Sequence, residues 1–161
     1  MSKKVCTLLF LRKNNEILLA MKKRGFGANR FNGVGGKLDP GETVEGALVR
    51  ECEEEIGGTP IKYHKIAEHN FIGKNDDGSE WNMYVHVYFC DEWKGEPTET
   101  EEMNPQWFNL KNIPYKNMWQ DDEYWLPQVL DGKKVFCKFT FDEKDNMLTH
   151  DVKEVETLPH E

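Results

Sequence analysis

The sequence has 161 residues, 38% of them hydrophobic and 31% charged, a composition typical of one globular domain spanning residues 1–161. The formal net charge is −8, from 29 acidic and 21 basic residues. This charge argues against tight binding to nucleic-acid polymers or anionic membranes, because a basic surface supplies most of the affinity for both. A phosphate-containing ligand would need a cation between itself and this acidic protein, and a divalent metal is the obvious candidate.

The first half of the chain is expected to form a hairpin, a loop and a helix. Residues 4–24 contain two β-type runs around a two-residue turn signal. Residues 25–37 are rich in glycine and are expected to form loops between short extended pieces. A helix is expected from Val44 to Ile56, because Thr43 is a suitable N-cap and Gly57 can adopt the left-handed conformation that ends helices.

The second half of the chain is expected to be mainly β-structure. Strands are expected at 61–73, 83–89 and 105–110, followed by a final hairpin at 133–142 and 146–155. Residues 83–89 alternate strictly, which predicts a strand with one buried and one solvated face. A second helix is expected to begin at Asp121 or Asp122, with Pro127 as a potential break in its middle. Mixed strands with two helices indicate an α+β fold, or a three-layer α/β/α arrangement.

The cysteines and the N-terminus both indicate a cytoplasmic protein. Four cysteines are widely spaced without a C-x-x-C pair, which is typical of reduced thiols in the cytosol. The N-terminal apolar run covers seven residues and ends at Arg12. It is too short for a signal sequence or a membrane span.

The predicted helix at 44–56 has an unusual acidic face. Glu51, Glu54 and Glu55 stand at i, i+3 and i+4 and fall within an arc of roughly 100°. That arc lies on the side of Val44 and Ala47, which has core contacts to make. Carboxylates that lean towards an apolar face repel each other and lose solvation unless a cation lies among them. Oxygen ligands of this kind suit Mg²⁺ or Mn²⁺. On helix composition alone, a hydrated surface helix is the alternative.

The spacing around this helix follows the pattern G-x5-E-x7-R-E-U-x-E-E-x-G-U, where U is aliphatic. Its fixed positions are Gly36, Glu42, Arg50, Glu51, Glu54, Glu55 and Gly57. This pattern resembles the Nudix box, the signature of pyrophosphate hydrolases. The U positions hold Cys52, a small apolar substitute, and Gly58, which departs from the pattern. The resemblance implies the Nudix fold, with a mixed curved sheet flanked by helices, and structural roles for Glu42 and Arg50.

The resemblance also implies the chemistry. Glu51, Glu54 and Glu55 would hold one or more Mg²⁺ ions, with Mn²⁺ as a substitute, and would help to activate water. Glu55 would be the most sensitive residue, and Gly36 would give a backbone carbonyl to a metal. The metal would neutralise polyphosphate charge and lower the pKa of bound water.

Similarity beyond the box extends over nearly the whole chain. The segments 21–37, 102–110, 113–127 and 134–141 resemble the MutT-homologue branch, which hydrolyses oxidised purine nucleoside triphosphates. The residues that this resemblance implies for base binding are Thr7, Lys22, Phe26, Asn32, Phe71, Met83, Trp119, Asp121 and Asp122. The resemblance also implies Glu102 as an extra metal ligand, and a monomer.

The chemistry of these residues suits a purine. Trp119 can stack on the base, and Asn32 offers a donor and an acceptor together. Asp121 and Asp122 are too close to be charged alike, so we expect one to be protonated at neutral pH. A protonated carboxyl donates as well as accepts, which could let one pocket take both oxidised guanine and oxidised adenine. Taken alone, the two aspartates would be ordinary helix caps.

The sequence therefore predicts a diphosphatase that converts 8-oxo-dGTP and 2-hydroxy-dATP into monophosphate and pyrophosphate and so sanitises the nucleotide pool. One alternative is a Nudix hydrolase of another nucleotide, such as O6-methyl-dGTP or ADP-ribose. The other is a Nudix-fold module that binds nucleotides without cutting them. Intact box glutamates argue against this second alternative.

Overall fold

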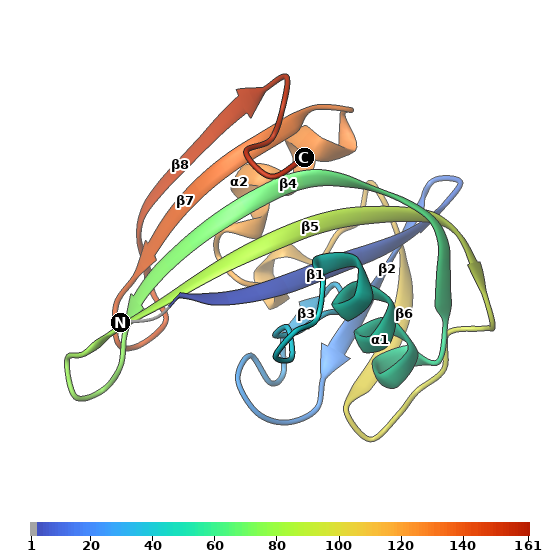
Figure 1. The fold of residues 1–161 in the computed structure, drawn as a ribbon, viewed down its shortest axis with the longest axis horizontal. Coiled ribbons are helices and arrows are strands. Elements are labelled where there is room, and N and C mark those ends of the chain that lie inside the picture. Colours follow the sequence, from blue (N-terminus) through green and yellow to red (C-terminus); the bar gives the residue numbers. More distant parts are fainter. Residues whose placement is uncertain (1–2) are drawn as a thin grey trace.

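The computed structural model describes residues 3–161, whose eight strands form one curved, mixed sheet (Figure 1). The strands are β1 (Lys4–Lys13), β2 (Glu16–Lys22), β3 (Phe31–Asn32), β4 (Thr59–Lys74), β5 (Glu80–Lys94), β6 (Met103–Asn109), β7 (Lys134–Phe141) and β8 (Met147–Val155). Their order is β3-β2-β1-β5-β4-β7-β8, and β6 pairs with β2. The pairs β1–β5 and β4–β7 are parallel and the others antiparallel. The predicted mixed sheet is confirmed.

Helices α1 (Val44–Ile56) and α2 (Asp122–Leu130) pack on opposite faces of this sheet, and one turn of 3₁₀ helix, η1 (Tyr115–Asn117), precedes α2 (Figure 1). Alternate residues of β1 show the layering. Leu9 and Leu11 pack in a core cluster with Leu48 of α1, whereas Phe10 packs in a second cluster with Trp125 of α2. The sheet is therefore the middle layer of an α/β/α sandwich, as predicted.

The ends of α1 lie where local sequence chemistry places them. The side chain of Thr43 accepts a hydrogen bond from the Gly46 N–H at 3.0 Å. Gly57 ends the helix with φ of 77°, and its N–H donates to the Glu53 carbonyl. The left-handed conformation strains any residue with a Cβ, so glycine suits this position. The predicted boundaries of α1 are confirmed.

Strand β5 differs from its prediction. It is longer than the predicted segment, and every residue from Tyr84 to Cys90 is buried. The reason is its central place between β1 and β4, where both faces are covered. Val87 packs in the core cluster on the α2 side, and Tyr88 packs in the cluster on the α1 side. The predicted solvated face is therefore wrong.

Helix α2 begins at Asp122 and continues through Pro127 without a break. The hydrogen bond that proline cannot donate would go to the carbonyl of Glu123, an exposed residue whose carbonyl can bond to water. All four cysteines are unpaired and buried. None of the helices in residues 3–161 has the length and apolar character needed to cross a membrane.

Candidate active site

The glycine-rich loop before α1 lies directly against the acidic face of that helix. The Gly35 N–H donates to a carboxylate oxygen of Glu55 at 2.7 Å. The Gly36 carbonyl accepts from the Thr7 N–H at 2.9 Å, which joins the loop to β1. A Cβ at residue 36 would lie 2.7 Å from a carboxylate oxygen of Glu51. A side chain at this position would push the Glu51 carboxylate aside, so glycine lets that carboxylate stay close to the loop.

The three box carboxylates differ in burial. Glu55 is only 5% exposed, and the side chain of Glu51 is 16% exposed. The side chain of Glu54 is 61% exposed. The prediction that all three lean towards the core therefore holds for Glu51 and Glu55, while Glu54 lies at the solvent edge because it is on the rim of the buried face.

Arg50 connects the loop to these carboxylates. Its guanidinium donates two hydrogen bonds to Glu42, at 2.7 and 2.9 Å, and one to the Lys37 carbonyl at 3.2 Å. The hydrogen bonds from Arg50 are the main reason that the pKa of Glu42 falls to about 2. Arg50 also donates to Glu51 at 3.0 Å and to Glu54 at 3.2 Å. These contacts are those expected of residues that fix the loop.

Burial raises the pKa of two box carboxylates, Glu55 and Glu51. It raises the pKa of Glu55 to about 8, against the opposing hydrogen bond from Gly35. The negative charges of Glu51 and Glu102 raise this pKa further, and the charge of Lys22 lowers it. Burial likewise raises the pKa of Glu51, against the nearby guanidinium of Arg50. Deprotonated carboxylates in this group are therefore unstable without a cation nearby.

The donor chemistry of this group fits a hard divalent cation. Carboxylate oxygens and a backbone carbonyl are the ligands that Mg²⁺ takes, and repulsion among the carboxylates would be relieved by its charge. As placed in residues 3–161, no three His, Cys, Asp or Glu side chains lie close enough together to hold one ion. Arg50 is instead the cation that bridges Glu51 and Glu54. Glu102 is exposed and lies 3.7 Å from Arg24.

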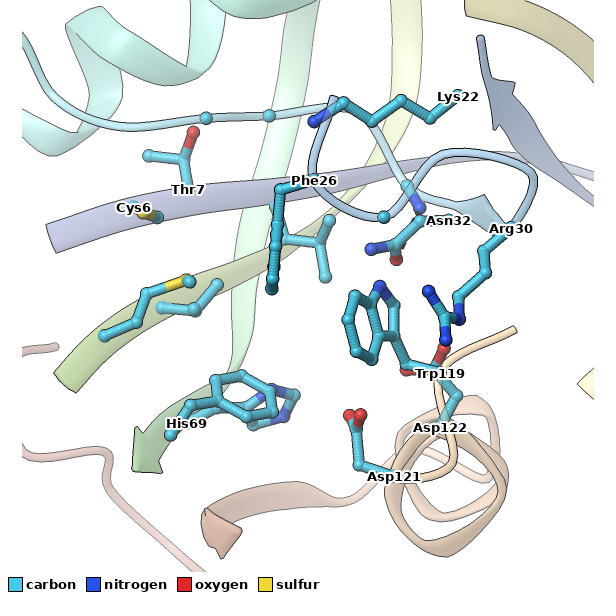
Figure 2. A pocket seen from close by; sticks show the side chains of 18 of the residues that line it. Cys6, Thr7, Lys22, Phe26, Arg30, Asn32, His69, Trp119, Asp121 and Asp122 are labelled. Atoms are coloured by element: carbon cyan, nitrogen blue, oxygen red, sulfur yellow. Dashed lines mark hydrogen bonds between the residues drawn. The ribbon is translucent and has the colours of Figure 1, made fainter. Parts of the chain in front are cut away.

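A cavity of about 310 Å³ opens beside this group, between the glycine-rich loop, the sheet and the start of α2 (Figure 2). All nine side chains predicted to bind the base line this cavity. They come from segments as distant in sequence as Thr7 and Asp122. The structure thus brings the predicted set together, and base binding by these residues stays a prediction.

Trp119 forms one wall of the cavity, and Figure 2 shows it between Phe26 and Arg30. The Phe26 ring stacks on it, with centroids 5.1 Å apart and planes at 29°. The Arg30 guanidinium lies 4.1 Å from the centroid of the same ring. Gly25 and Gly27, with φ of 81° and 83°, hold the exposed Phe26 over the cavity. A flat base would stack on Trp119 by displacing the exposed Phe26 ring.

Asp121 and Asp122 lie at the floor of the cavity, and neither side chain caps α2. Both are buried, and each accepts a hydrogen bond from the indole N–H of Trp125 at 3.1 Å. The capping alternative is therefore wrong. Burial raises the pKa of both carboxyls, and the charge of Asp121 raises the pKa of Asp122 further. These directions agree with the prediction that one of the pair is protonated at neutral pH.

Several other side chains that line the cavity are absent from the predicted set, among them Arg30, His69 and Trp81. Trp81 stands opposite Gly73 across β4 and β5, and a Cβ at Gly73 would lie 2.1 Å from its ring. A glycine facing a tryptophan across the predicted 75–79 turn is a signal that could have revealed this wall. His69 could have been found from its i, i+2 relation to Phe71, which places both on one face of β4.

Unpaired polar atoms concentrate in this cavity. In residues 3–161, six buried side-chain nitrogen or oxygen atoms have no hydrogen-bond partner. Four of them belong to residues that line the cavity: one oxygen each of Thr7 and Asp122, and both ring nitrogens of His69. Buried polar groups in proteins are normally paired, so such a concentration calls for an explanation, and a ligand with complementary groups provides one.

Comparisons with known proteins agree with this geometry. A family model described as the NUDIX domain matches residues 2–129. The chain belongs to the Nudix family. Members of this family generally use a divalent metal. The family match confirms the predicted class, a pyrophosphohydrolase with the Nudix fold.

Two curated relatives cover nearly the full length of the chain. A Mus musculus protein is 43% identical over 152 residues, which are 94% of this chain and 96% of the relative. A Danio rerio protein is 43% identical over 157 residues, 96% and 97% of the two chains. Each is named oxidized purine nucleoside triphosphate hydrolase. A mutator MutT protein from Bacillus halodurans shares the fold, with a TM-score of 0.82 at 19% identity, over 93% of this chain and 97% of that chain.

Proposed function

We propose that the protein hydrolyses oxidised purine nucleoside triphosphates, such as 8-oxo-dGTP and 2-hydroxy-dATP, to the monophosphate and pyrophosphate. Water attacks the β-phosphorus, and the bond from that phosphorus to the oxygen bridging to the α-phosphate breaks. The monophosphate leaves with the bridging oxygen, and the oxygen from water stays in pyrophosphate. The result is the removal of miscoding precursors from the nucleotide pool. The names of the two full-length relatives support this proposal.

The cavity is the observation that carries the proposal. Its walls offer a stacking surface at Trp119, and its floor offers the buried pair Asp121 and Asp122. Lys22 lines the same cavity, and its charge acts on Glu55 of the acidic helix. A nucleotide with its base against Trp119 would therefore direct its phosphates past Lys22 towards the box carboxylates.

We propose Mg²⁺ as the cofactor, with Mn²⁺ as a substitute. Glu51, Glu54, Glu55 and the Gly36 carbonyl would hold it, with Glu102 as a further ligand. The metal would supply a Lewis acid and a bound water of lowered pKa. Arg50 fixes the orientation of Glu51 and Glu54, and Gly35 fixes that of Glu55.

Pyrophosphate release from a panel of nucleotides tests the proposal. The purified protein is given Mg²⁺ and 8-oxo-dGTP, 2-hydroxy-dATP, dGTP, dATP, O6-methyl-dGTP or ADP-ribose. We expect the two oxidised nucleotides to have the highest kcat/KM, with no turnover in EDTA. Faster turnover of O6-methyl-dGTP or ADP-ribose would assign another Nudix substrate, and tight binding without turnover would assign a binding module.

We also infer a cytoplasmic monomer made of one domain, residues 1–161, that acts on free nucleotides. The net charge of −8 argues against nucleic-acid polymers as partners. Size-exclusion chromatography with light scattering tests the oligomeric state, and a mass near 18.9 kDa is expected.

A further inference from the structure

His69 has a ring that the protein encloses without pairing. It lies on β4, is 0% exposed and forms part of the cavity floor. Three aromatic rings meet it edge to face: Trp125 with centroids 4.4 Å apart, Phe71 at 5.5 Å and Phe139 at 5.6 Å. Neither ring nitrogen has a hydrogen-bond partner. The two ring nitrogens of His69 are therefore surrounded by aromatic rings that offer them no hydrogen bond.

The fold alone does not account for this residue. A neutral imidazole carries one N–H donor and one acceptor, and burial of both without partners opposes folding. A phenylalanine ring would fill similar space among the three aromatic neighbours without that penalty. The polar atoms of His69 therefore have their use in the cavity, where the other unpaired atoms of Thr7 and Asp122 also lie.

His69 does not act in the cavity by gaining or losing a proton. Burial lowers the pKa of His69 to about 3, and no charged neighbour contributes to this shift. The ring is therefore neutral at physiological pH, where it can donate from one nitrogen and accept at the other. A neutral imidazole can form hydrogen bonds with polar atoms of a ligand, but it does not attract a charged group.

We propose that His69 is a specificity-determining residue that hydrogen-bonds the purine base in the cavity, an inference that rests on the proposed function. Figure 2 shows His69 and Asp121 at the end of the cavity away from Lys22, where the base would lie and the phosphates would not. The bases selected are those with a polar atom on the edge that faces β4, while Asp121 and Asp122 pair with another edge.

The enclosure of His69 defines how the contact forms. With no exposed surface, the ring meets a base only when a covering side chain shifts. Phe71, whose ring meets His69 edge to face, lines the cavity and pairs with Met83 across β4 and β5, so a shift of Met83 makes room for Phe71 to move. The unbranched, flexible side chain of Met83 can move at little cost. A base that cannot hydrogen-bond to His69 does not offset the free-energy cost of this rearrangement. The rearrangement therefore favours bases that can form that hydrogen bond.

The substitution His69→Phe tests the proposal, because it keeps a ring of similar size and removes both polar atoms. Nucleoside monophosphates are titrated and followed by tryptophan fluorescence, since Trp81, Trp119 and Trp125 line the cavity. The probes are 8-oxo-dGMP, 2-hydroxy-dAMP, dGMP and dAMP. We expect affinity for the preferred base to fall about 10-fold or more, and preference among the four to narrow. His69→Gln, which retains a donor and an acceptor, should restore part of both.

The matched control is His86→Phe. His86 is also a buried histidine, on the neighbouring strand β5, but its Nδ1 lies 2.7 Å from the Lys65 ammonium and it does not line the cavity. This variant should leave the preference among the four probes unchanged.

A measurement on the unaltered protein covers the case in which His69→Phe fails to fold. Spectra of protein labelled with ¹⁵N-histidine should show a shift of a His69 ring nitrogen when 8-oxo-dGMP or 2-hydroxy-dAMP saturates the site. Unchanged ring nitrogens with both probes, or unchanged base preference in a folded His69→Phe, would overturn the proposal.

The outcome for His69 is separable from that for hydrolysis. Base preference that depends on His69, in a protein that hydrolyses no nucleotide, supports the role of His69 and refutes the proposed function. Hydrolysis of oxidised nucleotides with a preference that His69→Phe leaves unchanged refutes only the role of His69. A wild-type protein that binds none of the four probes refutes the role of His69, while pyrophosphate release still decides the proposed function.

Discussion

Glu68 and His69 are neighbours on β4 whose side chains lie on opposite faces of the sheet, and both are 0% exposed. The protein pairs the first completely. Glu68 accepts hydrogen bonds from the Tyr84 hydroxyl at 2.5 Å, the His160 N–H at 2.9 Å and the Lys65 ammonium at 3.3 Å. The Nδ1 atom of His160 lies 2.7 Å away. His69 has no such partner.

Glu68 and His69 show two different roles for buried polar side chains. The Glu68 group, formed by Glu68, Tyr84, Lys65 and His160, attaches the C-terminal residues to the sheet and is complete in itself. The cavity group, formed by Thr7, His69 and Asp122, keeps unpaired atoms beside open space. Groups that the protein pairs itself stabilise the fold, whereas unpaired groups beside a cavity serve a ligand. Substitutions in the two regions should therefore separate stability from activity.

The largest effect is expected for Glu55→Gln, among the box carboxylates beside the cavity. If this carboxylate helps to hold the metal and activate water, kcat should fall by about 10²–10⁴-fold. The free energy of unfolding should stay the same or rise, because glutamine removes a buried carboxyl whose pKa burial has raised. Pyrophosphate release and urea denaturation measure the two quantities.

Glu53→Gln is the control on the same helix. Glu53 is exposed, and its carboxylate accepts from the Thr59 hydroxyl at 2.8 Å, outside the site. The activity of the Glu53→Gln variant should match that of the wild type. Full turnover by Glu55→Gln, or by Glu54→Gln, would contradict a catalytic metal site at α1.

Glu68→Gln should do the reverse and reduce stability while base preference is kept. Burial alone would raise the pKa of Glu68, but hydrogen bonds from Tyr84 and His160 and the charge of Lys65 outweigh it, and the pKa falls to about 2. Because the folded pKa lies below the ordinary 4.5, the stabilisation is present above pH 4.5 and is lost as pH falls towards 2. At pH 7 the loss should be about 3 kcal/mol.

Urea denaturation of Glu68→Gln and wild type at pH 7 and pH 3 tests this window. The difference between the two proteins should shrink clearly at pH 3. Glu92→Gln, at an exposed carboxylate on β5, should be neutral at both. An equal loss at both pH values would mean that the group contributes through packing and not through charge.

Local chemistry explains which features of the helix and the cavity can be predicted from the sequence. The sequence predicts helix α1 to the residue, because its cap at Thr43, its stop at Gly57 and its glutamate spacing all act within one or two turns. The solvent exposure of Glu54 was missed because a helical wheel gives direction but not how far the surrounding chain covers it. The Nudix resemblance supplied the cavity residues as a set, from segments that spacing alone would not join.

The missed features depend on long-range packing. Full burial of β5 requires α1 on one face, α2 on the other and Glu68 with His160 beside Tyr84 and His86, none of which an alternating segment reveals. His69 looks like one polar residue in a strand until β4, β7 and α2 enclose it. Its chemistry follows from the absence of partners, which only coordinates can establish.

Asp121→Asn and Asp122→Asn sharpen the comparison within the cavity. If one carboxyl of the pair is protonated and donates to the base, each substitution fixes a different donor pattern. We expect the ratio of kcat/KM for 8-oxo-dGTP and 2-hydroxy-dATP to change by about 10-fold, in opposite directions for the two variants, because one hydrogen bond contributes about 1.4 kcal/mol here. A ratio unchanged in both variants would exclude the shared proton as the basis of base choice.

The smallest effect is expected for Gly73→Ala, which tests whether the apolar wall contributes to affinity but not to choice of base. The new Cβ would lie 2.1 Å from the Trp81 ring, so the ring must turn away from Phe141, on which it stacks at 6.5 Å. Losing one aromatic wall should weaken nucleotide binding about 3- to 10-fold. The ratio between oxidised guanine and oxidised adenine should stay the same, since no hydrogen-bonding atom is removed.

A double-mutant cycle with Trp81→Ala assigns this loss to the ring. If Gly73 acts only by leaving room for Trp81, the double variant should bind no more weakly than Trp81→Ala alone. A further loss in the double variant would mean that residue 73 contacts the nucleotide or strains β4 directly. A changed base ratio would mean that the apolar wall also selects. In that case the unpaired atoms of the cavity group would not be the sole basis of specificity. Hydrogen bonds would then not be the only contacts that select the base, and aromatic stacking would contribute to selection as well as to affinity.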